Sequence, residues 1–155
     1  MENTTSFSPA IVVTVDMGRV LSDVCATSAH LFASGQTQYR LSADNERLIA
    51  VKLREGFDDL MRRIAGYVTS AAFGTETATI TLRLPQHLGR SHIAAQTGNP
   101  ATAISLVAAA VEQTLTQYAL MCFHDPRTGP ARVEGTYRAA WLQARSRTLI
   151  LLSSL

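Results

Sequence analysis

Charged residues are scarce in this sequence, and lysine is the scarcest of them. Asp, Glu, Lys and Arg make up 17% of the chain, and Lys52 is its single lysine. About a quarter is usual for soluble domains. Interface cores are depleted in charge, so this composition fits a protein that buries surface against a partner as well as it fits a monomer rich in Thr, Ser and Gln. The net charge of +2 is too small to indicate nucleic-acid binding by itself.

The chain is also poor in metal-ligand and disulfide patterns. Its two cysteines, Cys25 and Cys122, are far apart in sequence, which does not support a disulfide framework. We expect both to be buried free thiols on the apolar sides of helices. His87 and His92 stand five positions apart without an acidic neighbour, which does not match the spacing of zinc ligands. The sequence therefore predicts no metal site and no cofactor.

Targeting and membrane segments are missing as well. Residues 1–10 lack the charged start and the apolar core of a signal peptide, and we expect them to form a mobile leader. The longest stretch with little charge, 101–123, contains only Glu112 but has too many Thr, Ser and Gln residues to face lipid. These patterns favour a cytosolic protein without a membrane span.

Catalytic motifs are absent too. The sequence contains no G-x-S-x-G nucleophile motif, no phosphate-binding G-x-x-x-x-G-K-[ST] and no G-x-G-x-x-G. Its adjacent carboxylates, Asp58 and Asp59, fall on the polar side of a predicted helix, where we expect them to be solvated. Because function has to be argued from a site, the sequence does not predict an enzyme.

What the sequence does contain is helical periodicity. Asp16 suits the N-cap of a first helix, and Asn99 followed by Pro100 is typical of the start of a third. The third helix is apolar nearly all round, so we expect it at the centre of the core or of an assembly. The four predicted helices span about 17–33, 43–69, 99–122 and 133–151.

One segment, 77–84, alternates as a β-strand, with Ile80, Leu82 and Leu84 on one face and threonines on the other. Its partner is either within the chain, at 11–15 or 35–42, or on a neighbouring subunit. The second option is slightly preferred, because both internal candidates are short. The predicted fold is mainly α: a single four-helix bundle-like domain over residues 1–155 with one or two short strands.

Two sets of residues are candidates for contacts with partners. The apolar C-terminal segment, 149–155, is expected to dock on something, because chain ends are usually polar. With the apolar face of the strand it gives the candidate interface: Ile80, Leu82, Leu84, Leu149, Leu151 and Leu152. A second set lies on the outer faces of the last helix and is expected to meet DNA or an acidic neighbour: Arg138, Arg145 and Arg147.

Two segments carry a family resemblance: "DNERLIAVKLREGFDDLMRRIAGYV", 44–68, and "NPATAISLVAAAVEQTLTQYALMCF", 99–123. Their pattern and order resemble the small α-helical head–tail connector, or adaptor, proteins of tailed bacteriophages. The likeness covers about half the chain and rests on no invariant motif. It implies a ring-forming homo-oligomer in the neck of the virion, assembled in the bacterial cytoplasm, that contacts portal and tail proteins and loosely touches DNA. The alternative is a soluble helical regulatory or scaffolding protein without enzymatic activity.

Overall fold

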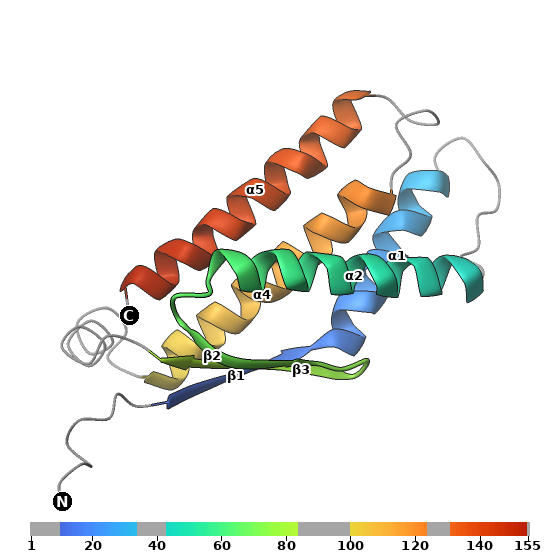
Figure 1. Cartoon of the computed structure of the whole chain (residues 1–155). Coiled ribbons are helices and arrows are strands. Elements are labelled where there is room, and N and C mark those ends of the chain that lie inside the picture. Colours follow the sequence, from blue (N-terminus) through green and yellow to red (C-terminus); the bar gives the residue numbers. More distant parts are fainter. Residues whose placement is uncertain (1–9, 34–42, 84–99, 124–130, 155) are drawn as a thin grey trace, which may run out of the picture.

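The computed structural model of the chain describes residues 10–33, 43–83, 100–123 and 131–154. In chain order these form β1 (Ala10–Asp16), α1 (Met17–Ala33), α2 (Ala43–Arg63), β2 (Val68–Phe73), β3 (Thr77–Arg83), α4 (Pro100–Phe123) and α5 (Ala131–Ser154). Figure 1 shows these helices on one side of a small sheet. The prediction of a mainly helical fold is confirmed. A four-helix bundle is not confirmed, because the helices share their core with the sheet.

The sheet has the strand order β1–β3–β2, and both outer strands run antiparallel to β3. Both edges of β3 are therefore paired within the chain, so the preferred prediction that 77–84 pairs with a neighbouring subunit is wrong. The internal candidate 11–15 is confirmed as part of β1. The other candidate, 35–42, lies outside the described residues, and the second partner is 68–73.

The sequence does not predict the strand β2, because the predicted second helix extends to residue 69, whereas α2 ends at Arg63. The helix ends at Arg63, and the Tyr67 N–H then closes a tighter turn by donating to the Ile64 carbonyl over 2.9 Å. The Tyr67 carbonyl in turn accepts the Arg83 N–H over 2.7 Å, which brings the chain alongside β3. Val68 continues the apolar helical stripe in the sequence, yet the ladder of hydrogen bonds to β3 determines its conformation.

The inner face of the sheet forms one wall of the core. Side chains in a strand alternate between faces, and the inward ones of β1 and β3 are all buried: Ile11, Val13, Val15, Ala78, Ile80 and Leu82. On β2 the ring of Phe73 packs against Phe57 of α2, with ring centroids 5.2 Å apart. The helices thus cover this face.

The helix α4 is the centre of the helical layer. It contacts α1, α2, α5 and β1, so it needs apolar residues on several sides, as the sequence predicts. Val107, Val111 and Leu115 on this helix are fully buried or nearly so. Within the described ranges no helix has the length and apolarity that crossing a bilayer requires.

Two buried threonines join α4 to α5. Their hydroxyl oxygens, on Thr114 and Thr148, lie 3.3 Å apart, and each hydroxyl also hydrogen-bonds to a carbonyl one turn earlier in its own helix. Both hydroxyls are therefore satisfied inside an otherwise apolar contact.

A glycine allows α2 and α4 to cross closely. A Cβ atom built on Gly56 would lie 2.8 Å from Cδ2 and 2.9 Å from Cγ of Tyr118. Carbon atoms pack at about 3.5–4.0 Å, so this approach needs a residue without a side chain. Tyr118 then packs edge-on against Trp141 of α5, with ring centroids 5.4 Å apart.

Candidate functional site: an acidic groove beside the sheet

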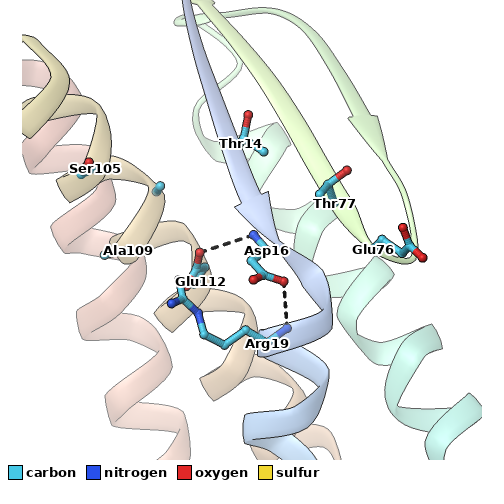
Figure 2. A pocket seen from close by; sticks show the side chains of 9 residues that line it. Thr14, Asp16, Arg19, Glu76, Thr77, Ser105, Ala109 and Glu112 are labelled. Atoms are coloured by element: carbon cyan, nitrogen blue, oxygen red, sulfur yellow. Dashed lines mark hydrogen bonds and ion pairs between the residues drawn. The ribbon is translucent and has the colours of Figure 1, made fainter.

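A groove of about 600 Å³ opens between the end of β1, the hairpin that joins β2 to β3, and the middle of α4 (Figure 2). Carboxylates, hydroxyls and alanines line it: Thr14, Asp16, Arg19, Glu76, Thr77, Ser105, Ala108, Ala109 and Glu112. Three segments that are distant in sequence thus contribute to one depression.

Asp16 holds the junction of strand and helix together. Its Oδ1 accepts the Arg19 N–H over 3.0 Å, so Asp16 is the N-cap of α1, as predicted. Its own N–H donates to Oε2 of Glu112 over 3.4 Å, while the Met17 N–H donates to the Glu76 carbonyl over 2.9 Å. These bonds position α1 against both α4 and the hairpin.

An ion pair closes one side of the groove. Nη2 of Arg19 lies 2.7 Å from Oε1 of Glu112, whose side chain is 16% exposed, whereas that of Arg19 is 61% exposed. The hydrogen bond and the negative charge of Glu112 raise the pKa of Arg19 above its ordinary value. Both carboxylate oxygens of Glu112 accept hydrogen bonds within the protein. This carboxylate therefore has a structural role and is poorly suited to act as a general base.

The groove is suited to contact with cations. Its three carboxylates outnumber its single guanidinium, and hydroxyls from Thr14, Thr77 and Ser105 supply further oxygens. Among the described residues no group of three or more His, Cys, Asp or Glu side chains is placed to hold a metal ion. The negative charge of the groove therefore attracts positively charged groups.

A second polar cluster lies where α2, α4 and α5 meet. The Tyr118 hydroxyl donates to Oε1 of Glu55 over 3.3 Å. Burial, followed by the contact with Cys122, raises the pKa of Tyr118. Burial also raises the pKa of the Cys122 thiol. A thiol with a raised pKa stays protonated at neutral pH and is a poor nucleophile. We therefore interpret this cluster as part of the packing between the helices.

The candidate interface residues on the strand belong to the chain's own core. Ile80 and Leu82 are each 1% exposed beneath the helices, and Leu84 lies outside the described residues. The helices of the same chain thus cover the apolar face of β3, which leaves no free surface for a neighbour at these two positions.

The C-terminal segment docks on its own domain. Leu152 is buried in the core, and Leu149 and Leu151 are half-buried against it. Ile150, by contrast, is 62% exposed and faces outward. The sequence pattern does not distinguish it from its apolar neighbours, because only the helical register of α5 turns it outward.

The three candidate arginines of α5 have different environments. Arg138 and Arg147 are exposed, as predicted. The prediction is wrong for Arg145: its side chain is 12% exposed and its Nη1 lies 3.1 Å from Oδ2 of Asp59 on α2. The Arg145 guanidinium also lies over the Trp141 ring, 4.5 Å from its centroid. Its role is therefore to tie α5 to α2.

Comparison of the chain with protein-family models, with curated proteins and with solved structures finds no match. The resemblance to connector proteins accordingly rests on the pattern and order of two helical segments.

Proposed function

We propose that this chain is a non-catalytic structural protein, a head–tail connector or neck subunit that forms a ring between the portal and the tail of a tailed phage or prophage particle. Supporting this proposal are the sequence pattern of the segments 44–68 and 99–123 and the low charge of the chain, which suits extensive interfaces. The acidic groove adds a surface that attracts basic side chains of a neighbour.

One structural observation carries most weight: among the residues that the structure describes, helices cover one side of the sheet and not the other (Figure 1). Within the described ranges β1 and β2 each pair with β3 alone, so each has one edge without a strand partner, and α4 lies beside that edge of β1. The β2 sequence, VTSAAF, contains neither the charges nor the proline that commonly protect such an edge. A protein whose function is to bind other proteins, and not to catalyse a reaction, can use this uncovered side of the sheet as contact area.

The alternative function, a soluble regulatory or scaffolding protein, has an observation in its favour. It predicts that the strand at 77–84 finds its partners within the chain, and β1 supplies one of them. Both functions are non-catalytic, and they differ in whether the protein is a stable component of particles.

Particle composition separates the two functions. We expect mass spectrometry of purified particles from the phage or prophage that encodes the chain to detect it in a fixed ratio to the portal protein. Native mass measurement on recombinant protein, alone and mixed with that portal, should show a closed oligomer on the portal. Some ring subunits assemble only on their platform, so the mixture is the decisive sample. Absence from particles together with no binding to portal would refute the connector proposal.

A further inference from the structure

The outer face of the sheet is free of charge over its whole middle. Residues that face each other across antiparallel strands point to the same side, and the register aligns two rows on the side away from the helices. These rows are Val12, Thr81 and Ser70, and Thr14, Thr79 and Ala72. No helix of the described ranges covers this side (Figure 1). Val12, an apolar residue, is 50% exposed here.

The two ends of this outer face carry opposite charges. Asp16 ends β1 beside Thr77, and Arg83 ends β3 beside Ala10; both charged residues are exposed. By the alternation along each strand, Asp16 and Arg83 lie on the same side as the two uncharged rows. Six residue steps separate them along the register, which corresponds to about 20 Å at the usual rise of an antiparallel strand.

We infer that this outer face is a docking surface for the same face of a second copy of the chain. A two-fold axis that lies between the sheets and runs across the strands reverses the strand direction of the second copy. Asp16 of each copy then lies over the Ala10 end of β1 in the other copy, one strand away from Arg83, and the uncharged rows meet in the middle. A two-fold axis along the strands would instead place like charges together, which disfavours it. Aligned packing of two sheets leaves about 10 Å between them, a spacing that small side chains such as Thr, Ser and Val fill.

The size of the face sets the strength of this contact. Three strands of about seven residues give a footprint of about 14 Å by about 23 Å. The area buried over both copies is then below about 1,200 Å², which is the range of transient complexes. The contact is accordingly a weak, concentration-dependent dimer. It goes beyond the proposed ring, because the ring needs a different surface on each side of every subunit.

Two matched variants test the surface. Val12→Lys places a charge on the outer face, where the two-fold axis brings the two copies together, whereas Val51→Lys places the same charge on α2, at a valine with a similar exposure of 54%. Sedimentation equilibrium over a wide concentration series should show a monomer–dimer equilibrium for the natural chain and for Val51→Lys. For Val12→Lys the dissociation constant should rise at least tenfold. Equal effects of the two variants, with circular dichroism unchanged, would overturn the assignment of the surface.

A cross-link tests the orientation. The chain has a single lysine, Lys52, so Arg83→Lys creates one new amine that a carbodiimide can join directly to a carboxylate. The two-fold arrangement predicts an amide bond between Asp16 and the new amine, and mass spectrometry of mixed light and heavy isotope-labelled chains should show that it joins two molecules. A distance of about 20 Å within one chain excludes an internal zero-length link. Cross-links from the new amine to other carboxylates alone would refute this orientation.

Other occupants of the face are outcomes of the same experiments. A chain that stays monomeric at every concentration, with Val12 protected from hydroxyl-radical labelling, would show that the chain covers its own sheet and would refute the inference. A monomer with Val12 freely labelled would refute it as well. Neither result bears on the presence of the chain in particles, so the dimer and the connector function can fail separately.

Discussion

Adding a single methyl group at Gly56 tests whether the α2–α4 crossing is as close as the structure shows. The new Cβ would meet the base of the Tyr118 ring at 2.8–2.9 Å and its Cβ at 3.1 Å. These atoms are fixed by the helix, so relief requires a shift of α2 against α4. Overpacking of this kind costs about 1–3 kcal/mol, and the better helix propensity of alanine returns about 1 kcal/mol at most. We expect Gly56→Ala to lower the free energy of unfolding by about 1–2 kcal/mol.

Urea denaturation followed by circular dichroism measures this loss. Gly66→Ala is the control, because nothing lies within 4 Å of the added Cβ; it should be neutral or slightly stabilising. In a double-mutant cycle, Tyr118→Ala should cancel much of the cost of Gly56→Ala, since it removes the clashing ring. A stabilised Gly56→Ala protein would mean that the helices lie further apart, and the reasoning on this crossing would then be refuted.

Three further predictions concern polar groups. Arg145→Ala should cost about 2–3 kcal/mol of unfolding free energy, because it breaks a partly buried ion pair and a ring contact. The control Arg138→Ala, on the exposed side of the same helix, should change it by no more than about 0.5 kcal/mol, and equal losses would contradict the burial of Arg145. Because the pKa of Tyr118 is raised in the folded protein, the unfolded chain releases its phenol proton at a lower pH, and the free energy of unfolding should fall as pH rises through the ordinary value of 10.0. In thermal melts, Tyr118→Phe should show a smaller decline with pH, and an unchanged decline would exclude this residue as the cause. Asp16→Ala should lower the free energy of unfolding by about 1 kcal/mol, whereas Asp16→Asn should leave it nearly unchanged, because asparagine caps helices as well as aspartate does. If the role of Asp16 were purely ionic, the denaturant midpoints of both variants would fall alike.

Helix boundaries that depend on local capping could be predicted from the sequence. The start of α1 follows from Asp16, whose side chain reaches the Arg19 N–H three residues later. The start of α4 follows from Pro100, which suits the first helical turn. Such signals act over a few residues, so the sequence alone contains them.

Features that depend on distant partners could not be predicted. The β2 strand is made of small and β-branched residues that a helical stripe also tolerates, and only pairing with β3 determines its conformation. The groove likewise joins Asp16 to Glu112 across 96 positions, and no local pattern announces such a contact. No feature of the sequence around Arg145 separates it from the exposed Arg138 and Arg147 of the same helix. Its position follows from its ion pair with Asp59 of α2.

The strand order has a consequence for how the chain folds during synthesis. β1 pairs with a strand that begins about 60 residues later, whereas β2 and β3 form a hairpin with a short turn. At about 5–20 residues per second, ribosomes need several seconds to deliver β3 after β1 has emerged. Throughout that interval the apolar side chains of β1 have no sheet to join, and once β3 emerges the β2–β3 hairpin has a much shorter loop to close than the β1–β3 pair. We expect this pairing of β1 with β3 to form more slowly than the hairpin, because its contacts are less local, and we expect the nascent chain to be exposed to aggregation until β1 is paired.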